Sequence, residues 1–253
     1  MQNKLVYTII GLAAFVFIIG GVLNWYKSQR TSNQSNTSET VTTEYNPTIN
    51  PDDFVPHIDN KYFTLKPGTK FRYENKTDEE REQIEVEVTN ETRQVMGVTA
   101  TIVRDRVWLN NELIEDTRDW YAQDKEGNVW YFGEDVDNYE NGKLKDHKGA
   151  WEAGIDGAKP GIIMPANPKP SYSYRQEYYQ GKAEDMGDIV ATDKKVTVAY
   201  GTFENCLQTR DWNKIDENAN EYKYYCPDVG FAVLEESVSG GTEKVELISV
   251  TVQ

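Results

Sequence analysis

Residues 82–91 read EQIEVEVTNE, and this short stretch decides the fold class. Ile84, Val86 and Val88 alternate with acidic residues in it. Because successive side chains of a strand point to opposite faces, this alternation places the three apolar residues on one face and the carboxylates on the other. The stretch therefore predicts a β-strand that buries one face in a core.

The same kind of pattern continues along the chain from residue 69. Further segments are rich in β-branched and aromatic residues: 69–74, 99–109, 112–124, 171–179, 194–200, 202–212, 221–226, 231–238 and 244–252. Turn sequences separate many of them, among them VMGV (95–98), LNNE (109–112), DKEGN (124–128) and YENGK (139–143). Asn-Gly between two strands is a strong hairpin signal. We therefore predict an all-β domain, an antiparallel meander that forms a barrel, a half-barrel or a sandwich, because a sheet of so many strands normally curls or closes.

The N-terminus carries a different signal. Residues 5–23, LVYTIIGLAAFVFIIGGVL, contain no charge, and as a helix they would span roughly 28 Å, which matches the hydrocarbon core of a bilayer. Trp25 and Tyr26 follow, where an aromatic belt would lie. We expect one transmembrane helix that acts as a retained signal anchor over 5–26, with a cleaved signal peptide as the alternative.

The rest of the chain divides by composition. Residues 1–4 form a short flank before the anchor, and 27–58 are rich in Ser, Thr and Asn, which predicts a flexible polar tether. Residues 59–253 form the predicted β-domain, for which we expect an extracytoplasmic location on a cell membrane. The bilayer is thus the first expected partner.

The formal net charge of −15 restricts the other partners. Phosphate backbones need a basic surface, so we expect no nucleic acid. An acidic surface serves solubility in the simplest interpretation, and binding of a cation or a basic ligand is the alternative.

The chain has two cysteines, Cys206 and Cys226. If 202–212 and 221–226 are the arms of a hairpin folded near Asp216, Arg210 faces Tyr222 and the two cysteines face each other. Directly opposed Cβ atoms lie close enough for a disulfide, which would imply an oxidising compartment. Two free thiols remain the alternative.

Signatures of most enzyme classes are absent from the sequence, including GxSxG, HExxH and the Walker loop. With His57 and His147 as the only histidines, we expect no zinc site, no other metal and no cofactor. A pair of carboxylates from Glu134, Glu152 or Glu177 would permit glycan hydrolysis if the two lay close together. DKEGN and the stretch 134–142 superficially resemble calcium loops but depart from the EF-hand spacing, so a calcium-stabilised structural domain is a further alternative.

An aromatic hairpin, DWYAQDKEGNVWYFGE (119–134), precedes a long Gly/Pro-rich stretch, GAWEAGIDGAKPGIIMPANPKP (149–170). If the hairpin folds about Glu126-Gly127, Tyr121 and Tyr131 share one face. One interpretation makes the hairpin a core strand pair and the stretch a packed plug. The other makes them the two walls of a ligand groove, since ligand sites are apolar concavities with a few polar groups. The ligand-binding residues would then be Trp120, Trp130, Glu134, Trp151, Glu152, Asp156, Lys159, Met164, Arg175 and Glu177.

Several long motifs occur in order along the chain: FTLKPGTKFRYE, DWYAQDKEGNVWYFGED, GAWEAGIDGAKPGIIMPANP, YRQEYYQGKAEDM and VTVAYGTFENCLQTRDW. Together they resemble a family of uncharacterised bacterial secreted or membrane-attached β-rich proteins, over roughly residues 60–250. The family has no established activity, so the resemblance implies an envelope β-domain and no reaction. The two cysteines look like a departure from the family pattern, which implies a staple and not a catalytic element.

The expected function is accordingly a membrane-anchored, non-enzymatic binding or structural module of the cell envelope. Its ligand would be a peptide, a glycan or a lipid. The carboxylate hydrolase and the calcium-stabilised domain are the alternatives.

Overall fold

The computed structural model describes residues 45–76, 80–216, 219–239 and 244–253. Within these ranges the chain is all-β apart from one short 3-10 helix. The elements are η1 (Pro51–Asp53), β1 (Phe54–Val55), β2 (Ile58–Asn60), β3 (Phe63–Leu65), β4 (Thr69–Lys76), β5 (Arg81–Val95), β6 (Val98–Leu109), β7 (Glu112–Asp124), β8 (Val129–Glu140), β9 (Lys143–Asp146), β10 (Trp151–Glu152), β11 (Lys159–Met164), β12 (Ser173–Arg175), β13 (Glu177–Tyr178), β14 (Asp185–Val198), β15 (Gly201–Asn213), β16 (Asn220–Cys226), β17 (Phe231–Ser237) and β18 (Lys244–Val252).

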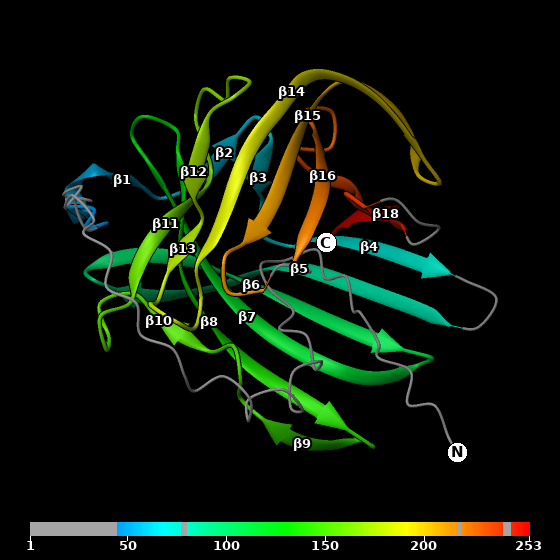
Figure 1. Ribbon diagram of the computed structural model, residues 1–253, viewed down its shortest axis with the longest axis horizontal. Helices are drawn as coiled ribbons and strands as arrows, with labels where there is room; N and C mark the ends of the chain where they lie inside the picture. The colour runs from blue at the N-terminus through cyan, green and yellow to red at the C-terminus, as the bar shows by residue number, and fades with distance from the viewer. Residues whose placement is uncertain (1–44, 77–79, 217–218, 240–243) are drawn as a thin grey trace, which may run out of the picture.

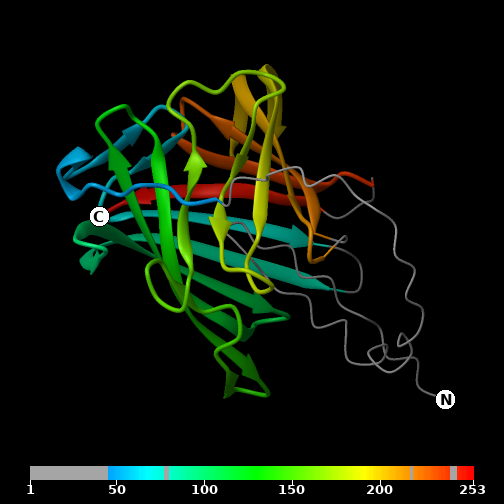
Figure 2. The ribbon, with the colours of Figure 1, turned by 60° about the vertical axis from the view of Figure 1, so that its left-hand side comes forward.

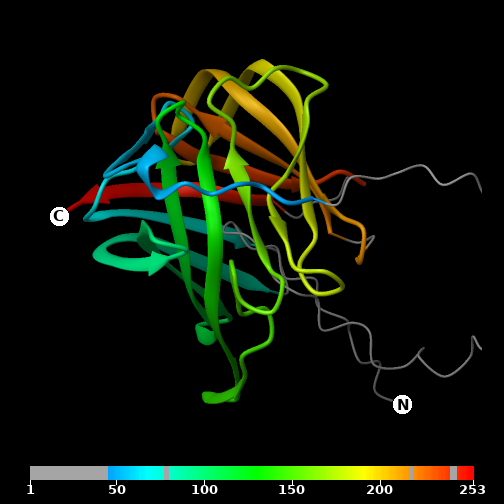
Figure 3. The same cartoon turned by 90° about the vertical axis from the view of Figure 1, so that its left-hand side faces the viewer.

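One large antiparallel sheet dominates the molecule (Figure 1). Its strands follow the order β12-β14-β15-β16-β17-β18-β4-β5-β6-β7-β8-β11-β13. Figures 2 and 3 show this sheet curving round until the yellow-green strands β11 to β13 come beside β14, so that it is nearly closed into a barrel. The predicted antiparallel all-β fold is confirmed. No helix in the described ranges is long and apolar enough to cross a membrane, and the predicted anchor at 5–26 lies outside them.

The barrel approaches closure through one short segment, residues 173–178. Its first half, β12, pairs with β14, and its second half, β13, pairs with β11. Gly161 of β11 leaves room for segment 173–178 to change its partner strand, because a Cβ on Gly161 would lie 2.3 Å from the backbone of Gln176. Only glycine allows two backbones to approach so closely.

The β2–β3 hairpin fills one end of the barrel interior. Phe63 lies between opposite walls, with its ring 5.3 Å from that of Tyr121 on β7 and 4.9 Å from that of Phe231 on β17. The Phe231 ring in turn stacks on Phe71 of β4 at 4.7 Å. Aromatic contacts of this kind add to the apolar area that the core already buries.

The alternation of 82–91 has the predicted result: Ile84, Val86 and Val88 are all buried. The turns also follow the sequence. Asn141 and Gly142 both have positive φ, 53° and 70°, as the two central residues of a type I′ hairpin turn do. The LNNE and VMGV turns also have positive φ at both central residues.

The two cysteines are joined, with an S–S distance of 2.02 Å. The predicted register is confirmed, since Arg210 pairs with Tyr222 and Gln208 with Tyr224. Both cysteines are fully buried, so the bond staples β15 to β16 inside the protein.

Residues before position 59 also contact the barrel. Tyr45 donates a hydrogen bond from its hydroxyl to the Pro160 carbonyl at 2.8 Å. Phe54 and Val55 form β1 and pair with β7. The described part of the predicted tether, 45–58, therefore lies against the barrel, because it carries apolar side chains to bury: Ile58 lies in the core, and Ile49 and Phe54 pack against it.

Candidate functional site

The 149–170 stretch is part of the sheet. Trp151 pairs with Glu134 in the β10–β8 ladder, and Ile162 pairs with Trp130 in the β11–β8 ladder. Trp151 and Met164 are buried. Two short strands of this stretch, β10 and β11, therefore pair directly with β8 of the aromatic hairpin.

Two of the predicted ligand-binding aromatics are held by structural contacts. Trp120 is 3% exposed and lies under the guanidinium group of Arg93, 4.0 Å from its ring centre. Arg93 also pairs with Glu152 at 2.6 Å, which places that predicted carboxylate in an ion pair. Trp130 is partly buried, and its indole Nε1 donates to Asp124 Oδ2 at 2.8 Å.

The other polar candidates are spread over the molecule. Asp156 is exposed at a turn with a φ of 51°. Lys159 Nζ donates to the Tyr45 carbonyl at 2.7 Å, and the Arg175 guanidinium lies over the rings of Tyr45 and Tyr178 at 5.3 and 4.7 Å. Lys159 and Arg175 therefore hold the entering chain against the barrel.

The structure does bring Glu134 and Glu177 together, inside the barrel. Charge repulsion from Glu177 acts on Glu134, which is 2% exposed, and Asp119 and Asp185 complete the group. Both oxygens of Glu134 are buried without a hydrogen-bond partner among the described residues. Asp119 and Asp185 were not predicted as members of this cluster because we expected acidic residues on the outer face of the sheet. Asp119 lies two residues before Tyr121 and so shares its inward face, and β8 has one extra residue between Tyr131 and Glu134, which puts Glu134 opposite Asp119 on that same face.

We call this cluster of four carboxyl side chains the buried carboxyl group; its members are Asp119, Glu134, Glu177 and Asp185. Burial has the largest effect on the pKa of each of them. Loss of hydration raises the pKa of Asp119 to about 7, although a hydrogen bond from the Tyr131 hydroxyl at 2.8 Å opposes the shift. Burial raises the pKa of Asp185 to about 8, against hydrogen bonds to Glu177 and Asn213. Burial and the neighbouring carboxylates hold the pKa values of Glu134 and Glu177 well above their usual range.

Carboxyls with raised pKa values could donate protons, which is the chemistry of a glycosidase acid. The four carboxyl side chains have exposed fractions of 0–3%, and a glycan must reach both carboxyls from solvent.

The calcium alternative has no support in the described ranges, where no group of three or more His, Cys, Asp or Glu residues is placed to hold a metal. Asp124 of DKEGN instead accepts hydrogen bonds from the backbone N–H groups of Glu126 and Asn128, at 3.0 and 2.9 Å. This carboxylate stabilises the hairpin turn.

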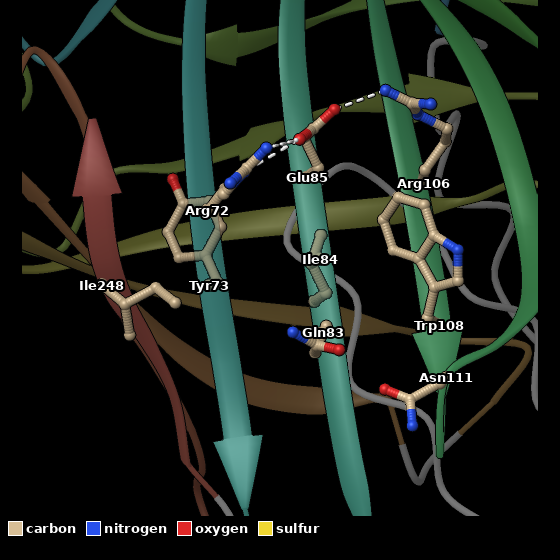
Figure 4. Close-up of a pocket in the computed structure, with 9 residues that line it drawn as sticks. All are labelled: Arg72, Tyr73, Gln83, Ile84, Glu85, Arg106, Trp108, Asn111 and Ile248. Atoms are coloured by element: carbon tan, nitrogen blue, oxygen red, sulfur yellow. Dashed lines mark hydrogen bonds and ion pairs between the residues drawn. The ribbon is translucent and has the colours of Figure 1, made fainter. Parts of the chain in front are cut away.

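A pocket of about 420 Å³ lies elsewhere, over strands β18, β4, β5 and β6 (Figure 4). Its lining residues are Arg72, Tyr73, Gln83, Ile84, Glu85, Arg106, Trp108, Asn111 and Ile248. The register explains the grouping: Arg72 pairs with Glu85, Glu85 with Arg106, and Gln83 with Trp108 across neighbouring strands. These five side chains stand on the opposite face of the sheet from Ile84, so we call the site the outer-face pocket.

Charge in the outer-face pocket is arranged around Glu85. Arg72 Nε donates to Glu85 Oε2 at 2.9 Å, and Arg106 Nη2 pairs with Glu85 Oε1 (Figure 4). Burial would raise the pKa of Glu85, but the hydrogen bond from Arg72 and the charges of Arg106 and Lys70 outweigh it and lower the pKa. Glu85 therefore stays ionised and holds both guanidinium groups in place.

Trp108 forms the aromatic wall of the outer-face pocket. Its side chain is partly exposed, and the Arg106 guanidinium lies 5.5 Å from its ring centre. Arg106 Nε is buried and has no acceptor in the described part of the chain. This pocket was not predicted from the sequence because the side chains that line it come from four strands. The available signal was the set of basic and aromatic residues at the polar positions of alternating strands.

No known protein family, curated protein or solved structure matches this chain. Its function must therefore be argued from its own residues.

Proposed function

We propose that this protein is a non-enzymatic binding module, and that its β-barrel is held at the extracytoplasmic surface of a membrane by the segment 5–26. The observation that carries the binding role is the outer-face pocket. It combines a partly exposed aromatic side chain, Trp108, with polar groups that Glu85 holds in fixed positions. Sites that recognise ligands combine an apolar wall with a few placed polar groups in this way, and volumes of roughly 300–1,000 Å³ are usual.

Two features support the extracytoplasmic membrane location. The charge-free run at 5–23 has the length of a membrane-spanning helix. The disulfide between Cys206 and Cys226 is of the kind that persists in oxidising compartments.

The burial of the carboxyls favours binding over hydrolysis. Glu134 and Glu177, the two candidates for a catalytic pair, face the barrel interior, and Glu152 is engaged by Arg93. The outer-face pocket offers a single carboxylate, Glu85, whose pKa is lowered, whereas a glycosidase acid needs a raised one.

The test uses the full-length chain in detergent micelles and in membranes of an expression host. Binding of peptide, glycan and lipid panels is measured by calorimetry for the wild type and for Trp108→Ala. We expect at least one class to bind and the variant to lose at least tenfold in affinity. Turnover of any panel member, or binding that Trp108→Ala leaves unchanged, would contradict the binding role. Extraction of the chain by alkaline carbonate would contradict the membrane anchor.

A further inference from the structure

We infer that the ligand of the outer-face pocket is an acidic saccharide, whose ring stacks on Trp108 and whose carboxylate is bound by Arg72 and Arg106. This inference rests on the proposed binding function and specifies its ligand class.

The ion pairs around the outer-face pocket leave a local excess of positive charge. Lys70, Arg72 and Arg106 surround Glu85 and Glu87, with Lys70 Nζ 3.0 Å and Arg106 Nη2 3.7 Å from Glu87 Oε2. Three cations thus share two carboxylates, which leaves a local excess of one positive charge. On a protein with a net charge of −15, this patch attracts an anion where most of the surface repels one.

The guanidinium groups of Arg72 and Arg106 keep donors for a ligand. The Arg72 side chain is 61% exposed, so part of its donor fork faces solvent while Nε and Nη2 contact Glu85. Arg106 contributes a buried Nε that no described acceptor satisfies. Guanidinium groups bind carboxylates through paired hydrogen bonds, and Glu85 keeps both groups oriented before a ligand arrives.

The remaining walls of the outer-face pocket suit a sugar ring better than an apolar peptide side chain. Trp108 gives a flat aromatic surface, and Gln83 and Asn111 bring amide groups that both donate and accept hydrogen bonds (Figure 4). Ring hydroxyl groups need partners of both kinds. Ile248, 36% exposed, completes the opposite side of the pocket with a small apolar surface.

The experiment is a calorimetric titration of the full-length protein in detergent with two matched probes. One is an oligosaccharide that contains glucuronic acid, and the other is its neutral glucose counterpart of the same length and linkage. We expect the acidic probe to bind at least tenfold more tightly. Arg72→Gln should reduce this preference to less than threefold, and Trp108→Ala should weaken both probes at least tenfold.

Two control variants separate the pocket from general effects. Lys195→Gln removes an exposed cation that pairs with Glu204 away from the pocket, and Tyr172→Ala removes an exposed aromatic ring next to β12. Neither should change the binding of either probe. Melting temperatures of all four variants within a few degrees of the wild type would establish that they fold.

The outcomes separate a failure of the acidic-saccharide ligand class from a failure of the proposed binding function. Equal binding of the acidic and neutral probes, still sensitive to Trp108→Ala, would overturn the acidic ligand class and leave the binding role intact. Binding of an acidic peptide and of neither saccharide, again dependent on Trp108, would overturn the saccharide class alone. Saccharide binding that Trp108→Ala does not weaken would overturn both.

Discussion

The buried carboxyl group makes the stability of this protein depend on pH in an unusual direction. Most proteins lose stability on acidification because their carboxylates are paired in the native state. Here burial raises the pKa of Asp119 from 3.8 to about 7, so the folded state holds a proton that the unfolded chain releases. This contribution is fully present below the ordinary pKa of 3.8 and is lost as pH rises through about 7.

The magnitude follows from the number of protons released. The unfolded chain binds about one proton fewer at this site than the folded chain near pH 5, and about half a proton fewer at pH 7, where the folded carboxyl is half ionised. The free energy of unfolding therefore falls by about 1.4 kcal/mol per pH unit near pH 5 and by about half that at pH 7, or by roughly 2 kcal/mol across the interval, from Asp119 alone. Asp185, with a pKa of about 8, changes stability in the same direction and extends the decline to higher pH.

The assay is urea unfolding at pH 5, 6, 7 and 8, with Asp119→Asn as the test variant. The asparagine still accepts a hydrogen bond from Tyr131 but does not titrate, so the slope of stability against pH should become shallower by about one proton. Lys195→Gln, a change on the exposed surface, should leave the slope unchanged. A wild-type stability that is flat or rising from pH 5 to 7, or an Asp119→Asn slope equal to the wild type, would refute the reasoning.

Three further predictions concern parts that hold the barrel together. Reducing the Cys206–Cys226 bond, which closes a sequence separation of 20, should lower the free energy of unfolding by about 3 kcal/mol, as urea unfolding with and without reductant will test; no change would rule out a stabilising role. Gly161→Ala should cost roughly 1–3 kcal/mol because its Cβ would meet the Gln176 backbone, and a melting temperature equal to the wild type would contradict that close approach. Trp151→Ala should cost roughly 3–5 kcal/mol as a core truncation, and a loss below 1 kcal/mol would contradict its burial.

The sequence was most informative where local rules determine the structure. The alternation around Val86 predicted its strand and buried face, and Asn141-Gly142 predicted a turn that the φ values confirm. The register of Cys206 and Cys226 followed from counting residues about one hairpin. Each of these depends on neighbours close in the chain.

Features that depend on distant segments were not predicted. β10 and β11 were not expected because glycines and prolines hide the alternation of 149–170, and their partner β8 determines their conformation. The inward direction of Glu134 depends on a bulge in β8, where one extra residue lies between Tyr131 and Glu134. The outer-face pocket depends on the registers of two successive hairpins, which bring Arg72 and Arg106 to either side of Glu85, and on β18, a strand far along the chain that brings Ile248 beside them.

The short segment 173–178 makes the barrel wall uneven in strength. β14 and β15 pair along most of their length, whereas β13 and β11 share only Lys159 with Tyr178 and Pro160 with Glu177. Pro160 has no N–H to donate to that ladder. Local opening costs least where the fewest hydrogen bonds break, so this line should open first when the native state fluctuates. The first interior side chain uncovered there is Glu177, so water would enter the acidic interior by the same line at which the wall separates.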